Sequence, residues 1–297
     1  MDWALRLITL YEVICKQYRE HLWVYCQRFS PYADLAFTDE EVICIYLWGV
    51  MNKRREIKDI YEDTRRYLHG WYPQLPSYAG YVQRLNRVAG VFGPLLGALQ
   101  EAFPDSGVRR EIRLMDAMPI RLAHAKRSRR ARVVAELADK GYCAAKGEYD
   151  YGVKVHVLGL RRPGTLPLPD YLGLTPASEH ALTAFRHIVS QLHGGELYLD
   201  KAYADELLVQ ASKADQDLAL LIPVKKAKGQ AYLDAADQWW STAVSRVRQP
   251  IESLFNWIEE KTGIQRASKV RSTNGLMVHV FGRFAAAMYL LAEAQSA

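Results

Sequence analysis

Residues 194–208 read GGELYLDKAYADELL, and they contain a change from an apolar strand to a helix. Leu197 and Leu199 alternate with Tyr198, as they do in a strand, and Asp200 then stands where an apolar residue is expected. This acid has two readings. Asp is a favoured N-cap residue for a following helix. A strand end also holds a charged side chain at the rim of a sheet, where ligands of open α/β sheets bind.

The composition is that of an ordinary globular protein. A chain of 297 residues predicts about two domains, and 49% hydrophobic with 24% charged residues is enough for a sizeable core. The 39 Lys and Arg exceed the 33 Asp and Glu, which suggests a polyanionic partner. Four scattered cysteines form no C-x-x-C pair and argue against a zinc knuckle. We see no signal peptide and no apolar run of membrane-spanning length, and expect an intracellular protein with no membrane contact.

The first part of the chain, residues 1–105, has helical periodicity throughout. Thr38, followed by DEEV, predicts a capping box and a helix to about Met51, and Ser77 predicts the N-cap of a later helix. Basic residues recur on these helices. Such a unit could be related to helix-turn-helix proteins, although solvated basic faces explain the pattern equally well.

The second part, residues 106–297, begins with period-two alternation. Strands are predicted at 111–120, 149–160, 169–178, 196–200 and 218–224, with helices at 178–195, 205–214, 239–262 and 274–295. Three strands that can form a meander, followed by alternating helices and strands, predict an α/β fold. We expect a mixed five-stranded sheet flanked by helices and preceded by an all-α N-terminal domain.

Carboxylates stand at corresponding places in this pattern. Asp116 ends or nearly ends the first strand, Asp200 ends the fourth, and these two strands can be neighbours. Glu252 is the candidate third acid, on a helix whose predicted buried stripe is Leu254, Phe255 and Ile258. Converging carboxylates repel one another unless a cation lies between them, and their oxygens suit Mg²⁺ or Mn²⁺. Two such ions can hold the attacking and leaving oxygens of a phosphoryl transfer.

These segments together resemble a known family. LMDAMPI, YDYGVKVH, LTPASEH, ELYLDKAYAD and RQPIESLFNWIEEKTG are similar to bacterial insertion-sequence DDE transposases, whose catalytic domain is ribonuclease H-like. The resemblance covers roughly residues 105–290. It implies that Asp116, Asp200 and Glu252 bind two divalent metal ions, Mg²⁺ or Mn²⁺. It implies an endonuclease that cuts the element ends and joins them to target DNA in DNA recombination.

The resemblance also implies partners and domain roles. Residues 1–105 would form a helical DNA-binding domain and residues 106–297 the catalytic domain. The partner would be double-stranded DNA, both transposon ends and target, bound by a homodimer in the cytoplasm near the nucleoid. Two alternatives remain: a catalytically silent, transposase-derived DNA-binding protein, and a nuclease of the same fold that performs no strand transfer.

Several cations are candidates for DNA contact. The run HAKRSRRAR follows the Asp116 strand, Lys201 follows Asp200, and Arg248 precedes Glu252 by four residues, as a basic residue does in the family. The expected DNA-binding residues are Lys126, Arg127, Arg129, Arg130, Lys201 and Arg248. For the run, a solvated charge cluster is the plain alternative. Pro250 requires that the Glu252 helix start near Gln249 or kink there.

Other residues invite a functional reading that we set aside. ELADKGYC (136–143) resembles the family's strand end more closely than LDKAY does, but its periodicity predicts a helix to about Lys140, capped by Gly141. We therefore exclude Asp139. His156 is expected to be a core histidine. Trp239 and Trp240 could stack on a base, but core or interface packing is the preferred interpretation.

Overall fold

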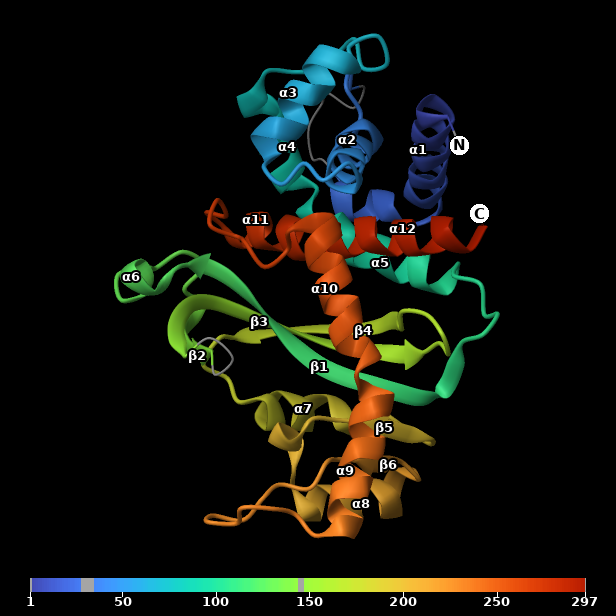
Figure 1. The fold of residues 1–297 in the computed structure, drawn as a ribbon. Helices are drawn as coiled ribbons and strands as arrows, with labels where there is room; N and C mark the ends of the chain where they lie inside the picture. Colours follow the sequence, from blue (N-terminus) through green and yellow to red (C-terminus); the bar gives the residue numbers. More distant parts are fainter. Residues whose placement is uncertain (1, 28–34, 144–146, 297) are drawn as a thin grey trace. The chain divides into compact units, whose positions relative to one another are not determined.

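The computed structural model describes residues 2–27, 35–143 and 147–296 (Figure 1). The chain forms two compact units, Met1–Pro104 with Ile258–Ala297, and Asp105–Trp257. The first boundary lies next to the expected one. Residues 258–297 group with the N-terminal helices, although their sequence pattern assigned them to the second domain. Their last helix is apolar on most sides and needs other helices to cover it.

The first unit is entirely helical. Its α-helices are α1 (Trp3–Glu20), α2 (Asp39–Met51), α3 (Ile57–Tyr67), α4 (Tyr78–Arg87), α5 (Phe92–Glu101), α11 (Thr273–Met277) and α12 (Arg283–Ser296). Short 3₁₀ turns cover Leu22–Cys26 and Ala89–Val91, and a π-helical turn covers Val278–Gly282. Helix α2 packs against α1, α3 and α12, and α12 also packs against α5. The hydroxyl of Tyr46 donates to the carbonyl of Val278 at 3.1 Å inside this core.

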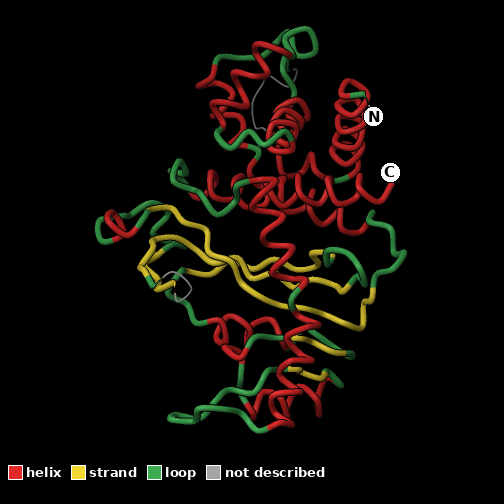
Figure 2. The backbone as a smooth tube through the Cα atoms, viewed as in Figure 1, coloured by secondary structure: helices red, strands yellow, loops and turns green. Residues whose placement is uncertain are grey.

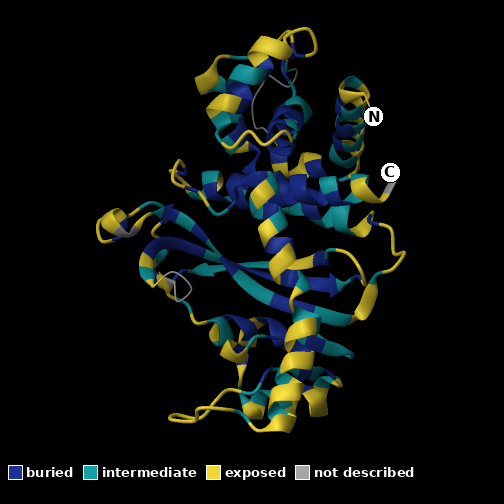
Figure 3. Ribbon diagram, in the orientation of Figure 1, coloured by how far each residue is buried: buried dark blue, intermediate teal, exposed yellow. Residues whose placement is uncertain are grey.

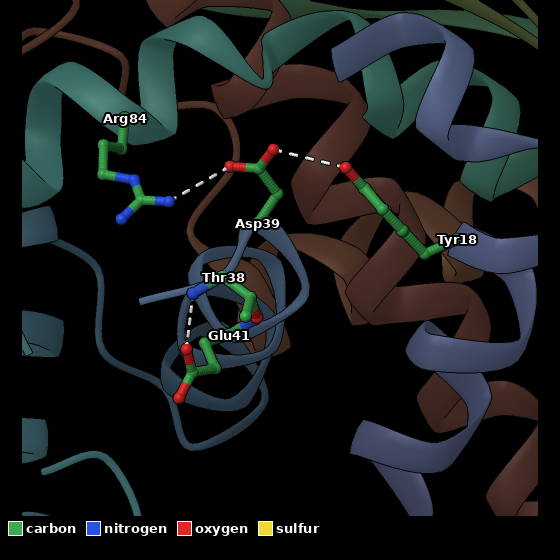
Figure 4. Close-up of polar contacts among 5 residues, drawn as sticks. All are labelled: Tyr18, Thr38, Asp39, Glu41 and Arg84. Atoms are coloured by element: carbon green, nitrogen blue, oxygen red, sulfur yellow. Dashed lines mark hydrogen bonds and ion pairs between the residues drawn. The ribbon is translucent and has the colours of Figure 1, made fainter. Parts of the chain in front are cut away.

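The start of α2 confirms the predicted capping box. Thr38 Oγ1 accepts from the Glu41 backbone N–H at 3.2 Å, and the Glu41 carboxylate accepts from the Thr38 N–H at 2.5 Å (Figure 4). The adjacent Asp39 is buried and accepts from Tyr18 Oη at 3.3 Å and Arg84 Nη2 at 3.4 Å. Helices α1, α2 and α4 are therefore tied together by one buried carboxylate.

One helical stretch of this unit is long and apolar enough to cross a membrane. It covers Thr273–Gln295, with mean hydropathy 1.5, and 72% of its most apolar window is buried in the structure. Buried alanine, methionine and phenylalanine side chains of α12 account for that hydropathy. This is the pattern of a core helix.

The second unit is built on a mixed six-stranded sheet, drawn in yellow in Figure 2. Its strands are β1 (Arg109–Ala123), β2 (Asp139–Cys143), β3 (Glu148–Arg161), β4 (Leu168–Pro176), β5 (Glu196–Tyr198) and β6 (Ala219–Leu221). The order is β2-β3-β1-β5-β6. β4 shares with β2 the edge of β3 that faces away from β1. β1 runs antiparallel to β3 and parallel to β5, so the predicted meander and the predicted pairing of the first and fourth expected strands are confirmed.

Helices flank this sheet, and Figure 3 shows the central strands buried beneath their exposed faces. They are α6 (Ala125–Ser128), α7 (Ala181–Val189), α8 (Glu206–Gln216), α9 (Ala235–Arg248) and α10 (Pro250–Thr262), with a 3₁₀ turn at Lys201–Tyr203. α8 is the crossover that parallel pairing of β5 and β6 requires. α9 contacts β5. The mixed sheet flanked by helices, after an all-helical N-terminal region, is the expected fold with one additional strand.

The additional strand begins within the last residues of a predicted helix, and most of that predicted helix, residues 129–138, is turn and loop. The periodicity predicts a helix that continues to about Lys140. In the structure helix α6 already ends at Ser128, and strand β2 begins at Asp139. Gly141 is no C-cap. A Cβ there would lie 2.1 Å from the carbonyl oxygen of Ala177, so the close backbone approach requires glycine. The Asp139 carboxylate accepts a 2.7 Å hydrogen bond from the Ser178 N–H and another from its hydroxyl, and β3 separates it from β1.

Candidate active site

The register of two strands places Asp116 near Asp200. Parallel pairing of β1 with β5 matches Leu114 to Tyr198, an offset of 84 residues. The same offset relates the two acids, since 200 − 116 = 84. Each acid lies two residues beyond that last matched pair. Both carboxylates therefore lie where β1 and β5 separate, close enough for Asp200 to raise the pKa of Asp116.

The position of Asp116 within its strand differs from the prediction. β1 does not end near Asp116 but continues to Ala123, and Asp116 pairs with Val157 of β3. β5 is much shorter than β1, so only the β5 side of β1 becomes free at this point. Asp116 is held by a rigid ladder on one side and has an open sheet edge on the other.

Helix capping does not account for Asp200. It occupies the N-cap position of the 3₁₀ turn at Lys201–Tyr203, but its side chain makes no capping hydrogen bond. The following helix, α8, is capped by a different acid, Asp205, whose carboxylate accepts from the Leu208 N–H at 3.2 Å. The Asp200 carboxylate is left available for a ligand.

The Asp116 carboxylate has two partners. Its Oδ1 accepts from the Ala117 N–H at 2.8 Å, and its Oδ2 accepts from Arg248 Nη1 at 2.8 Å. Burial raises the pKa of Asp116, and Asp200 adds to that effect. The Ala117 N–H and Arg248 oppose the rise without cancelling it. Burial and the neighbouring Asp200 thus disfavour the charged form of Asp116, and a bound cation would favour it.

Glu252 reaches this place from the first turn of α10. α9 ends at Arg248 and α10 begins at Pro250, so proline takes the first helical position, where it removes no intrahelical hydrogen bond. Ile251 is buried, and its Cδ1 lies 3.1 Å from where a Cβ on Gly159 of β3 would stand, so a glycine lets the helix approach the sheet. The neighbouring Glu252 side chain is 51% exposed. The predicted buried stripe of Leu254, Phe255 and Ile258 is confirmed.

Arg248 joins two of the three acids. Its Nη2 donates to Glu252 Oε1 while its Nη1 donates to Asp116. Its side chain is only 12% exposed. Burial lowers the pKa of Arg248, but Asp116, Glu252 and Asp200 outweigh burial and raise it. The guanidinium of Arg248 thus lies between Asp116 and Glu252, and Asp200 is near enough to affect its pKa. In the described part of the chain, no group of three or more His, Cys, Asp or Glu is arranged to hold a metal ion.

Tyr203 is a site residue that the sequence patterns did not identify. It is 2% exposed, and its hydroxyl has no hydrogen-bond partner among the described residues. Burial raises its pKa first, and Asp116 and Asp200 raise it further. The signal was present in the quoted LDKAY segment, where the tyrosine follows Asp200 by three residues, one turn of a 3₁₀ helix.

The expected DNA-contact cations fall into two groups. Lys201 and Arg248 lie at the carboxylates, and Lys201 is exposed. The other four, Lys126, Arg127, Arg129 and Arg130, are exposed on and just after α6. Seven residues of β1 separate Asp116 from Ala123, about 23 Å at ~3.3 Å per residue. The structure therefore does not bring this second group to the carboxylates.

The predictions of core packing for His156 and for the two tryptophans have different outcomes. His156 is fully buried, and its Nε2 lies 2.9 Å from Thr175 Oγ1, so the prediction of a core histidine is confirmed. Trp239 is 77% exposed, so core packing is wrong for this residue. Trp240 donates from Nε1 to the Ile222 carbonyl at 2.9 Å.

A family model described as "Transposase DDE domain" matches residues 106–272, more than half of the chain. The chain belongs to the DDE transposase family. The matched range begins at the first residues of the sheet unit and includes Asp116, Asp200 and Glu252. No curated protein matches the chain. DDE transposases act on DNA and generally use divalent metal ions, which agrees with the oxygen donors at this transposase's Asp116 and Asp200.

Proposed function

We propose that this transposase hydrolyses a phosphodiester at each end of its element and joins the freed 3′ ends to target DNA. Asp116, Asp200 and Glu252 would hold two Mg²⁺ or Mn²⁺ ions. The observation that carries this proposal is the shared offset of 84 between the β1–β5 register and the two aspartates. That coincidence supports a site in which the hard oxygen ligands of the two aspartates would lie side by side on the sheet.

The roles of the side chains follow from their surroundings. Bound metal ions would activate the attacking hydroxyl and offset charge on the transferring phosphoryl group. Asp116 and Asp200 are positioned by the sheet and supply fixed carboxylates. Glu252 is half exposed and reaches the site through its ion pair with Arg248, so it would complete the ligand set when that ion pair opens. Lys201 and the released Arg248 would then face the DNA phosphates.

The wider assembly is part of the same proposal. Residues 1–105 would contribute to DNA binding, and the cations on and after α6 would contact DNA away from the carboxylates. Holding two transposon ends would require a homodimer on double-stranded DNA, acting in the cytoplasm near the nucleoid. The link from Glu252 through Arg248 to Asp116 supports a catalytic protein over a silent descendant, since it keeps Glu252 on the side of α10 that faces one of the two aspartates.

The test is Mn²⁺-dependent cleavage of duplex DNA carrying the ends of the element, by wild type and by Asp200→Asn. We expect the variant to lose at least about 100-fold in cleavage, more than loss of an outer-shell partner costs, and to lose Mn²⁺ binding in calorimetry while it still binds DNA. Asp205→Asn, which alters the α8 cap and the ion pair with Arg186, is the control and should cleave normally.

Equal cleavage and Mn²⁺ binding by wild type and Asp200→Asn would contradict the assignment of the metal ligands. DNA binding without cleavage by any of these proteins would favour the silent DNA-binding protein. Cleaved ends that never become joined to a target duplex would favour a nuclease of the same fold.

A further inference from the structure

The helical unit contains a basic cavity of about 370 Å³ that the catalytic proposal does not use. Six cationic side chains line it, together with a single carboxylate, that of Glu56. The cations are Arg55, Lys58, Arg266, Lys269, Arg271 and Arg283. All belong to the same compact unit, yet they come from chain segments that precede and follow the sheet unit.

These cations have no acidic partners. In the described parts of the chain, none of the six forms an ion pair, although carboxylates are available nearby. The two residues just before Arg55 show the contrast: Lys53 pairs with Glu260 at 3.1 Å, and Arg54 pairs with Asp63. Positive charge is compensated beside the cavity and left uncompensated inside it. Such a concentration of like charge is unfavourable unless an anion binds.

Part of the cavity is rigid. Arg283 is only 3% exposed, and its guanidinium donates from Nη2 to the Arg55 carbonyl at 2.5 Å and from Nη1 to the Thr262 carbonyl. Arg271 donates from Nη1 to the carbonyls of Ser268 and Val270, both at 2.7 Å. Two guanidinium groups are therefore fixed by backbone oxygens before any ligand arrives, which lowers the entropy cost of binding.

The other cations are arranged differently. Arg55, Lys58, Arg266 and Lys269 are exposed, as is Arg271, so Arg283 is the buried member of the six. His279 also lines the cavity, but burial and the neighbouring Arg283 hold its pKa well below the ordinary value, so it adds no charge. Exposed cations around a fixed basic floor suit an extended polyanion that lies across the opening. The exposed phenol of Tyr78 and the amide of Asn86 on the same wall can bond to phosphate or sugar oxygens.

We infer that this cavity binds the sugar–phosphate backbone of double-stranded DNA. The inference rests on the proposed function, which makes DNA the partner, and adds a specific contact surface. Because four of the six cations come from residues 266–283, the DNA-binding surface of the helical unit is not confined to residues 1–105. Contacts to phosphates carry no sequence information and depend steeply on salt, because each contact releases condensed counterions.

The experiment measures binding of the full-length protein to a duplex of arbitrary sequence, by fluorescence anisotropy over a NaCl series with EDTA present. The test variant carries Arg266→Gln and Lys269→Gln, two exposed and unpaired cavity cations. The control carries Lys53→Gln and Arg54→Gln, which remove the same charge from paired positions in the same unit. We expect the magnitude of the slope of log K against log salt to fall by about 2 in the test variant. Each of the two lost phosphate contacts accounts for ~0.9 of that fall. The control should change the slope by less than half of that.

A wild-type slope and affinity in the cavity variant would overturn the inference, as would equal losses in both variants, which would show a general charge effect. Thermal melting confirms that each variant is folded. The salt series with Asp200→Asn separates this inference from the catalytic proposal, because Asp200 does not line the cavity and its variant should keep the wild-type slope. Loss of cleavage in Asp200→Asn together with unchanged binding by the cavity variant would reject the cavity and retain the catalytic site.

Discussion

Arg248 and Asp116, 132 residues apart in the chain, are joined by a 2.8 Å hydrogen bond between guanidinium and carboxylate. The same guanidinium also binds Glu252. The positive charge of Arg248 therefore offsets part of the negative charge of these two acids. It does so by binding the carboxylate oxygens that would coordinate a metal ion. A planar guanidinium can join two carboxylates in this way, whereas an ammonium offers no such fixed fork.

At the proposed metal site this contact would make Arg248 a competitor of metal ions as well as a DNA contact. Arg248→Gln should bind Mn²⁺ about tenfold more tightly, because one charge-assisted hydrogen bond of ~1.5–3 kcal/mol no longer holds the ligand oxygens. Its DNA cleavage should fall. Calorimetric titration with Mn²⁺ and a cleavage assay on the same preparation measure both effects. Arg246→Gln removes an equal charge from the exposed face of α9 and is the control. Weaker Mn²⁺ binding by Arg248→Gln alone would show that the guanidinium supports the metal site.

Tyr203 offers a test that separates stability from catalysis. Its buried hydroxyl has no partner among the described residues, so Tyr203→Phe should leave stability unchanged or raise it by about 1 kcal/mol. Cleavage should fall about tenfold if the hydroxyl contacts groups bound at Asp116 and Asp200, a loss equivalent to ~1.4 kcal/mol. Urea unfolding and cleavage rates provide the two readouts. Tyr149→Phe, at an exposed tyrosine of β3, is the control. Unchanged cleavage would assign Tyr203 to packing against Phe185, whose ring lies 5.7 Å away edge-on.

Local signals predicted most of the elements. The capping box at Thr38 and the N-cap at Ser77 operate within one helical turn, so they are visible in the sequence, and both are confirmed. The alternation before Asp200 is equally local, and it indicated the strand that ends just before this acid. The adjacency of the first and fourth expected strands followed from their order along the chain.

The structure differs from the predictions at features that are determined by contacts between residues distant in the sequence. Residues 139–143 have helical periodicity nearby, but the free edge of β3 pairs with them and makes a strand. The length of β1 beyond Asp116 depends on its ladder with β3. The bridge made by Arg248 depends on tertiary distances that no spacing rule contains. The grouping of residues 258–297 with the N-terminal helices also rests on distant residues, since α12 packs on α2 and α5; the domain roles stay a prediction.

The segment 139–143 resembles the family's strand end but lies outside the candidate site. A substitution at Gly141 tests whether this glycine is required for close backbone packing in a strand or caps a helix. Gly141→Ala would place a Cβ 2.1 Å from the Ala177 carbonyl oxygen, a backbone atom that cannot move aside cheaply. We expect the free energy of unfolding to fall by about 1–3 kcal/mol, the usual cost of overpacking. Chemical denaturation measures the loss. Gly70→Ala is the control, since nothing lies within 4 Å of the added Cβ. A helix capped at Gly141 would instead predict similar small effects for both variants.

His156 should make the protein sensitive to acid. Burial lowers its pKa from 6.5 to about 4, and Lys154 adds to the effect. Between pH 4 and pH 6.5 His156 binds a proton in the unfolded chain but not in the folded chain. The stability that neutral His156 contributes is therefore complete above pH 6.5 and is lost as the pH falls toward 4. At about 1.4 kcal/mol per pKa unit, the difference between the two pKa values of His156 corresponds to about 3 kcal/mol in the free energy of unfolding. Urea midpoints between pH 4 and pH 7 should fall steeply in wild type. His156→Gln, which keeps a polar group near Thr175, should show a shallower slope in this window, and parallel curves for the two proteins would show that other groups cause the acid sensitivity.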